Sequence, residues 1–204
     1  MKYLYPVIMT VPAAVSGLRR AERQRALSRF AREPLTVSAD KAGLTLPALL
    51  EKDRRGAPLP ADGLWWSVTH KPEFAGGIVS TEKTGIDIEK IAPYSPALMK
   101  KIVSPEEARL FDADSADILF RCWTAKEAVL KATGRGLAGL SRCRVEAVMN
   151  HMELAVSFDC YLWSVEQCFF SGHLAAVAKK EEDRVVWALL DENGKDIPLD
   201  KMKD

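Results

Sequence analysis

Three strand-like segments that follow one another closely restrict the fold of this chain more than any other feature of its sequence. They cover residues 64–70, 74–80 and 85–89, and short polar connections separate them. Connections this short join antiparallel neighbours, because parallel strands of one sheet need a crossover of about a dozen residues or more. The sequence therefore predicts a small antiparallel meander.

Helices are expected before this meander. Residues 3–11 predict a buried first strand, and residues 19–30, which contain five arginines, predict a short basic helix. Leucines at helical spacing predict a second helix over residues 38–52, with Ser38 near its capped start. Prolines and glycines then indicate a loop over residues 52–63.

The second half of the chain also mixes helices and strands. Ser104-Pro105-Glu106-Glu107 predicts a helix start, because it combines an N-cap serine, a proline at the first helical position and a capping-box glutamate. The main helix is predicted from Asp114 or Ser115 to Thr133, and Gly134 ends it. Strand-like runs follow at residues 143–149, 153–158, 160–165, 173–178 and 185–190. Together these patterns predict the α+β class.

The composition, with 48% hydrophobic and 28% charged residues, is typical of an ordinary soluble globular protein. A net charge of +1 provides no strong field to attract nucleic acid or an anionic membrane. Four scattered cysteines favour reduced thiols in a cytoplasm over a zinc site or a disulfide framework. Residues 3–15 also resemble a weak signal peptide, although Pro6 and Pro12 favour a strand. No other segment approaches the roughly 20 apolar residues of a membrane span.

Two carboxylates share one face of the strand predicted at residues 85–89. Side chains alternate along a strand, so Ile86 and Ile88 point one way while Asp87 and Glu89 point the other. Neighbouring carboxylates repel unless a cation or several donors lie between them, and Mg²⁺ favours such oxygen ligands. A solvated acidic face on an edge strand is the alternative interpretation of this segment.

The main helix is predicted to have a buried and a functional face. Cys122 and Val129 lie on the buried stripe, whereas Glu127 and Lys131 lie one turn apart on the opposite side. A glutamate and a lysine four residues apart are also the commonest ion pair on any helix surface, and that alternative stays open. The neighbouring Trp123 weakens it, because a purely solvated face rarely carries large aromatic side chains.

These segments together resemble the signature motifs of the 4′-phosphopantetheinyl transferases. The first motif is Gly85-Ile86-Asp87-Ile88-Glu89, and the second is Trp123-Thr124-Ala125-Lys126-Glu127-Ala128-Val129-Leu130-Lys131-Ala132-Thr133-Gly134-Arg135-Gly136-Leu137. An upstream Ser-His motif of the family resembles Trp66-Ser67-Val68-Thr69-His70, with Thr69 in place of the serine. The resemblance covers residues 64–137 well. The chain is similar to the larger, monomeric, surfactin-synthetase-activating branch of that family.

The resemblance implies both a fold and an activity. The fold has two similar halves, residues 1–90 and 91–204, which are related by a pseudo-twofold axis and each place helices on a small antiparallel sheet. Coenzyme A binds in the cleft between them. The activity is transfer of 4′-phosphopantetheine from coenzyme A to a serine of an acyl, peptidyl or polyketide carrier protein, with release of 3′,5′-ADP.

The roles of individual residues follow from the same resemblance. The implied site consists of Asp87, Glu89 and Glu127 as ligands of Mg²⁺, Lys131 and His70 at the phosphates, and Lys126 at coenzyme A. In the reaction, Lys131 supplies a fixed positive charge, while Glu127 or a water held by the metal carboxylates accepts the serine proton.

One departure from the family pattern concerns a phosphate-binding lysine. The family's Gly-Lys-Pro is Gly56-Ala57-Pro58 here, so the lysine is absent, and Arg54 or Arg55 could supply its charge. The basic helix at residues 19–30 lies where the family grips the 3′-phosphate. The absence of the lysine also motivates a second hypothesis, a non-catalytic coenzyme A-binding relative.

Overall fold

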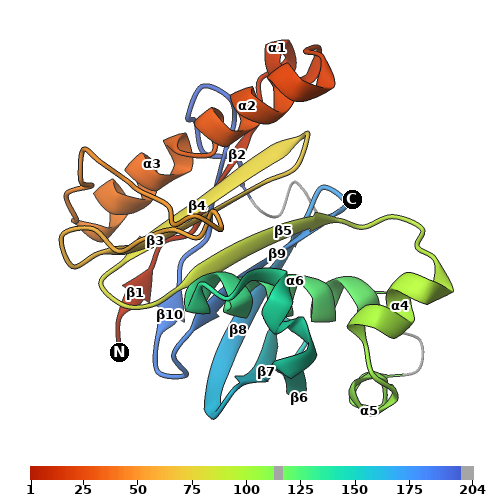
Figure 1. Cartoon of the computed structure of the whole chain (residues 1–204). Coiled ribbons are helices and arrows are strands. Elements are labelled where there is room, and N and C mark those ends of the chain that lie inside the picture. Colours follow the sequence, from red (N-terminus) through yellow and green to blue (C-terminus); the bar gives the residue numbers. More distant parts are fainter. Residues whose placement is uncertain (113–116, 199–204) are drawn as a thin grey trace.

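Two larger β-sheets with helices packed on them, and a third sheet of only two strands, form the described part of the molecule, which is taken from a computed structural model (Figure 1). The structure describes residues 1–112 and 117–198. The sheets stack against each other where Ile86 and Ile88 of one meet Gly76 of the other. This mixture of helices and largely antiparallel sheets confirms the predicted α+β class.

The first sheet contains four strands in the order β11-β2-β4-β3. Their bounds are Val7–Thr10 for β2, Trp65–His70 for β3, Phe74–Ser80 for β4 and Ala188–Leu190 for β11. Strand β4 runs antiparallel to β2 and β3, but β11 runs parallel to β2. A separate parallel pair joins β1 (Tyr3–Leu4) to β10 (Arg184–Val185). The expectation of purely antiparallel sheets is therefore wrong, because the chain returns to the first sheet through its last strands.

The second sheet contains five antiparallel strands in the order β5-β9-β8-β7-β6. They are β5 (Gly85–Lys90), β6 (Cys143–Asn150), β7 (Glu153–Phe158), β8 (Tyr161–Phe170) and β9 (His173–Lys179). The bounds confirm four strands predicted in the second half. The fifth predicted strand, at residues 185–190, is divided between β10 and β11.

Helices cover both sheets (Figure 1). On the side of the first sheet they are α1 (Ala13–Ser16), α2 (Arg20–Phe30) and α3 (Glu33–Ala42). On the side of the second they are α4 (Pro96–Ile102), α5 (Pro105–Ala108), α6 (Ile118–Thr133) and a 3₁₀ helix (Gly136–Arg142). Helix α3 packs on β4, and α6 packs along β5 and β9.

The predicted three-stranded meander is wrong at its third strand. Strands β3 and β4 form the expected hairpin, but β5 pairs with β9 in the other sheet. Glycines in β4 account for this arrangement. A side chain at Gly76 would meet Ile86 and Ile88 of β5, whereas one at Gly77 would meet Leu35 of α3. Strand β5 therefore lies against a face of β4 instead of beside its edge.

The predicted helix over residues 38–52 is also wrong. Helix α3 covers Glu33–Ala42, with Pro34 in its first turn and Gly43 ending it at φ 66°. Ser38 does not cap this helix. Its buried hydroxyl donates a hydrogen bond to the carbonyl of Tyr5 and accepts one from the amide of Val79. Leu50, on which the helical pattern depended, reaches the core from a non-helical segment.

Other boundaries agree with the sequence or shift slightly. The basic helix and the end of α6 at Gly134, in the left-handed region at φ 66°, are confirmed. The expected start of α6 at Asp114 or Ser115 lies outside the described residues, and the described helix begins at Ile118. The first strand is divided by Pro6 into β1 and β2. The boundary between residues 90 and 91 and the pseudo-twofold axis stay predictions.

A search for membrane-spanning helices covered the described residues. None of the helices there combines the length and the apolar character that a membrane crossing requires.

Candidate functional site

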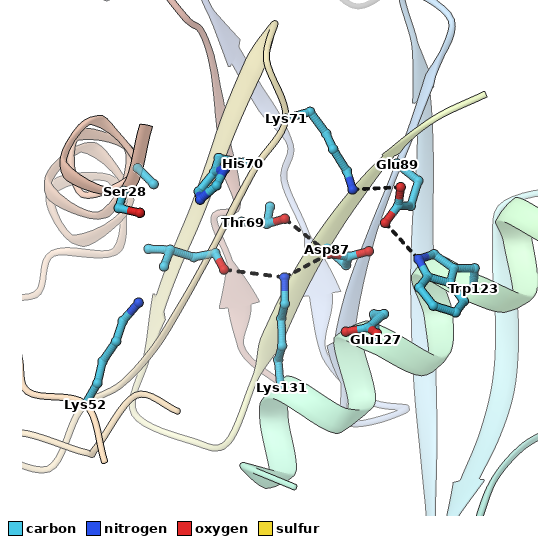
Figure 2. A pocket seen from close by; sticks show the side chains of 12 residues that line it. Ser28, Lys52, Thr69, His70, Lys71, Asp87, Glu89, Trp123, Glu127 and Lys131 are labelled. Carbon is cyan, nitrogen blue, oxygen red and sulfur yellow. Dashed lines mark hydrogen bonds and ion pairs between the residues drawn. The ribbon is translucent and has the colours of Figure 1, made fainter. Parts of the chain in front are cut away.

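A pocket lies where β3, β5 and α6 meet, and it gathers most of the residues that the motifs single out (Figure 2). Its lining includes all three predicted metal ligands and both predicted phosphate contacts, namely Asp87, Glu89, Glu127, His70 and Lys131. Strand alternation explains the contribution of β5. Ile86 and Ile88 are fully buried between the sheets, so Asp87 and Glu89 face the pocket.

Asp87 is the most deeply buried of these carboxylates, with 5% of its surface exposed. Its Oδ1 accepts hydrogen bonds from the Lys131 ammonium at 2.8 Å and from the Thr69 hydroxyl at 3.1 Å. Its Oδ2 is buried and has no hydrogen-bond partner in the described part of the chain. A buried carboxylate oxygen without a donor is costly, and a cation at that position would relieve the cost.

Glu89 is held by two residues that the sequence analysis did not assign. The indole Nε1 of Trp123 donates to Oε1 at 2.7 Å, and the ammonium of Lys71 lies 2.7 Å from Oε2. The sequence could have indicated that both residues lie at the site, because Lys71 follows His70 directly and Trp123 lies one helical turn before Glu127. The Trp123 indole therefore links α6 to β5 through the carboxylate.

Glu127 is a carboxylate with an unusually high proton affinity. Burial raises its pKa to about 7, and the negative charges of Asp87 and Glu89 also raise it, against the opposing effect of Lys131. Lys131 itself reaches across to Asp87 and to the carbonyl of Ile86 at 3.0 Å. The surface ion pair considered for Glu127 and Lys131 is thus replaced by a lysine that bridges α6 and β5.

The oxygen ligands of these residues suit a divalent cation. Their present arrangement does not. The oxygen ligands are hard, and one of them, Oδ2 of Asp87, has no hydrogen-bond partner among the described residues. However, Lys131 and Lys71 engage Asp87 and Glu89. Among residues 1–112 and 117–198, no three acidic, histidine or cysteine side chains are gathered closely enough to hold a metal ion. The metal site stays a prediction.

The opposite wall of the pocket is cationic. His70 lies there with a pKa lowered by burial, then by the positive charges of Lys131, Lys71 and Lys52. Lys52, which the sequence analysis left unassigned, also lines an adjoining pocket formed by the loop near Ala57 and the turn after α6. Arg55 lines this second pocket, whereas Arg54 is exposed and lines neither.

Lys126, like Arg54, is a predicted site residue that the structure brings to neither pocket. Its ammonium is buried and forms an ion pair with Glu107 at 2.7 Å, and it donates to the carbonyl of Ile102 at 2.6 Å. Glu107 in turn accepts from the amides of Ser104 and Val145. The predicted contact of Lys126 with coenzyme A therefore has no support in the geometry. Its side chain instead fastens α6 to α5 and β6.

Replacing Lys126 with methionine is expected to destabilise the protein by about 3–5 kcal/mol, because the Glu107 carboxylate would remain buried without its counter-ion. The free energy of unfolding in urea measures this effect. Lys100→Met, at an exposed lysine on α4, is the matched control. Adding Glu107→Gln to Lys126→Met should restore part of the loss. Equal stability of the Lys126 and Lys100 variants would contradict a structural role for this pair.

Comparisons with known proteins found a family model and several relatives that match part of this chain. Residues 83–180, which contain both β5 and α6, match the model of the 4′-phosphopantetheinyl transferase superfamily. The 4′-phosphopantetheinyl transferase HetI of a Nostoc strain is 34% identical over 125 residues, which are 55% of this chain and 52% of that protein. Enterobactin synthase component D of Salmonella typhi is 32% identical over 122 residues, 56% and 51% of the two chains.

A third relative, the 4′-phosphopantetheinyl transferase psf-1 of Bacillus pumilus, is 29% identical over 100 residues, 46% of this chain and 43% of that protein. The chain spans about half the length of the curated relatives that it matches. Residues 83–180 of the chain are thus similar to the 4′-phosphopantetheinyl transferase superfamily.

Proposed function

We propose that this protein transfers the 4′-phosphopantetheine arm of coenzyme A to a serine of an acyl, peptidyl or polyketide carrier protein. The observation that carries the proposal is the meeting of Asp87 and Glu89 with Glu127 and Lys131 in one pocket. The two motifs lie on different elements, and each would be ordinary alone. Their convergence, in a segment that matches the superfamily, supports a common catalytic role.

In the proposed reaction, the serine hydroxyl oxygen forms a bond to the β-phosphorus of coenzyme A. The bond from that phosphorus to the oxygen of 3′,5′-ADP breaks, and 3′,5′-ADP leaves with the bonding electrons. Glu127, or a water held by the metal carboxylates, accepts the serine proton. Lys131 provides positive charge beside the phosphates, where negative charge develops on the leaving group.

Asp87, Glu89 and Glu127 are the residues that would hold Mg²⁺. The ion would neutralise negative charge on the pyrophosphate oxygens. The residues of the chain would contribute orientation: the Trp123 indole fixes one oxygen of Glu89, and the Thr69 hydroxyl fixes one of Asp87. Lys131 and Lys71 would shift from the carboxylates toward the phosphates of coenzyme A.

Magnesium is expected to raise the melting temperature of the protein, because a ligand that binds only the folded state stabilises it. A Mg²⁺ concentration about 100 times the dissociation constant contributes about 2.7 kcal/mol. Differential scanning fluorimetry with EDTA or with increasing Mg²⁺ measures the shift. Asp87→Asn should remove most of it, whereas Asp191→Asn, outside the pocket, should preserve it. Equal shifts in both variants would contradict the proposed ligands.

Incubation with coenzyme A, Mg²⁺ and a set of purified apo-carrier proteins tests the function directly. Transfer adds one phosphopantetheine mass to a single serine of the carrier, which intact-mass spectrometry resolves. Tight binding of coenzyme A without any mass shift would favour the non-catalytic relative. Absence of both binding and transfer would contradict the proposal altogether.

We also propose that the protein is a monomer of the larger branch of the family, that its two halves are related by a pseudo-twofold axis, and that it is located in the cytoplasm. In support, one chain supplies two sheets, each with helices packed on it. All four cysteines, Cys122, Cys143, Cys160 and Cys168, are free thiols, which is ordinary in a reducing compartment. Light scattering coupled to size-exclusion chromatography measures the oligomeric state.

A further inference from the structure

Lys71 holds one of the proposed metal ligands through an ion pair that joins the two larger sheets. It directly follows β3 of the first sheet, and its ammonium lies 2.7 Å from Oε2 of Glu89 on β5 of the second (Figure 2). The two side chains are 28% and 19% exposed, so solvent screens this pair less than it screens a pair on the open surface. The pair is therefore a partly buried feature of the pocket itself.

The backbone of Lys71 is fixed by the hairpin that carries it. Its amide donates a hydrogen bond to the carbonyl of Phe74 at 2.7 Å, which closes the turn between β3 and β4. Phe74 is buried in a cluster that also contains Ile88 of β5, so the turn is packed against the second sheet. The hairpin thus presents the ammonium to the pocket from an anchored backbone. Only the flexible four-carbon stem of the lysine is free to move.

Glu89 has a partner on each of its carboxylate oxygens in the metal-free protein. The indole of Trp123 donates to Oε1, and the ammonium of Lys71 occupies Oε2. The Trp123 ring packs against the hydrophobic core of the second sheet, so it cannot withdraw without losing that packing. The ammonium of Lys71 can withdraw on its flexible stem. Oε2 is therefore the oxygen of Glu89 that can become available to a metal ion.

Lysines already balance the negative charge of this pocket. Among the described residues, three acids and three lysines line it. Lys131 pairs with Oδ1 of Asp87 and leaves Oδ2 without a partner in the described part of the chain. Lys71 differs, because it covers the oxygen through which Glu89 would reach a metal ion. A divalent cation at that oxygen must displace the ammonium, since two cations in contact with one oxygen repel each other strongly.

We infer that Lys71 is a tethered counter-ion of Glu89 that competes with Mg²⁺ and sets how tightly the pocket binds the metal. This inference rests on the proposed function, which assigns Glu89 to the metal. In the metal-free protein, the ammonium neutralises a carboxylate that would otherwise repel Asp87. When the ion binds, the ammonium leaves Oε2, so the loss of the ion pair offsets part of the free energy of metal binding.

Isothermal titration calorimetry with Mg²⁺ alone, on the full chain after removal of metal with EDTA and desalting, tests this inference. Lys71→Met should bind Mg²⁺ about 10-fold more tightly than the wild type, because the competing ammonium is absent. Lys71→Arg keeps the positive charge and should bind Mg²⁺ no more tightly than the wild type. In urea with EDTA, Lys71→Met should unfold at lower urea concentrations than the wild type, and saturating Mg²⁺ should reduce that difference.

Lys90→Met is the matched control, because it also removes a lysine that is paired with a glutamate. Lys90 forms an ion pair with Glu73 at the end of β5, but it lines neither of the two pockets. The Mg²⁺ affinity of this variant should lie within about twofold of the wild-type value, because solvent screens the more exposed pair.

The results that would overturn the inference differ from those that would refute the proposed function. Equal or weaker Mg²⁺ binding by Lys71→Met, an equal gain in Lys90→Met, or no Mg²⁺ binding by any of the variants would overturn the inference, even if the wild type loads a carrier protein. Tighter Mg²⁺ binding by Lys71→Met alone, without transfer to any carrier by the wild type, would instead refute the proposed function and leave the inference standing.

Discussion

Glu127→Gln is expected to reduce phosphopantetheine transfer by at least about 100-fold, because glutamine cannot accept the serine proton. The substitution keeps the size of the side chain, so the contacts of α6 with β5 should persist. Single-turnover loading of a carrier protein, followed by intact-mass spectrometry, measures the rate. Glu192→Gln, at an exposed glutamate, is the control. A Glu127 variant with the turnover of the wild type would contradict the proposed base.

The same variant should be more stable than the wild type in the presence of EDTA. The pKa of Glu127 is raised from 4.5 to about 7 in the folded protein, so folding favours the protonated carboxyl. Wild-type stability should therefore fall as the pH rises from about 4.5 to about 7, whereas the neutral glutamine avoids this loss. The expected difference at pH 8 is on the order of 1–3 kcal/mol, allowing for partial solvent screening.

Urea unfolding at pH 8 and at pH 4.5 separates this effect from a general change in packing. The stability difference between Glu127→Gln and the wild type should be present at pH 8 and should disappear at pH 4.5. A glutamine variant that is less stable at both pH values would show that the carboxylate contributes favourable contacts, contrary to the electrostatic argument.

Gly85→Ala is expected to destabilise the protein by roughly 3–5 kcal/mol, because it removes the closest approach between β5 and α6. An added Cβ would lie 2.0 Å from the carbonyl oxygen of Ala128 and 2.6 Å from the amide nitrogen of Ala132. Both are backbone atoms of the helix, so relief requires the helix to move away from the strand. That movement would also separate Glu127 from Asp87.

Thermal unfolding and the Mg²⁺-dependent shift in melting temperature both report on this variant. If it folds, the shift should be smaller than in the wild type, because the carboxylates lie farther apart. Gly17→Ala is the control, since its added Cβ meets atoms only at 4.0 Å and its backbone has a φ of −76°. It should change stability by less than about 1 kcal/mol. Equal stability of the two variants would contradict the close approach.

Several sequence predictions failed where long-range packing decided the outcome. The pattern of leucines around residues 38–52 resembles a helix, yet Gly43 ends α3, and Leu50 reaches the core from a non-helical segment. The turn between β4 and β5 is short enough for a hairpin, yet β5 joins the other sheet. Period and turn length are local properties, whereas the pairing of β5 depends on Gly76, which accepts its isoleucines.

The sequence by itself determined the α+β class, the alternation that places Asp87 and Glu89 on one face of β5, and the end of α6 at Gly134. These features depend on strand period, helix capping and the conformational freedom of glycine, all of which operate within a few residues. The family motifs also named Asp87, Glu89, Glu127, Lys131 and His70, which the pocket brings together, but they named Lys126 as well, which lies outside it.

Only the tertiary structure decided which charges face one another. Lys131 forms an ion pair with Asp87. Glu89 is held by Lys71 and Trp123, and Lys126 forms a buried ion pair with Glu107. Lys52 approaches the pocket because its loop is closed by Asp53 and Pro58. Coulomb interactions and desolvation depend on distances through space. Residues that are remote along the chain set those distances, so the sequence pattern could not assign them.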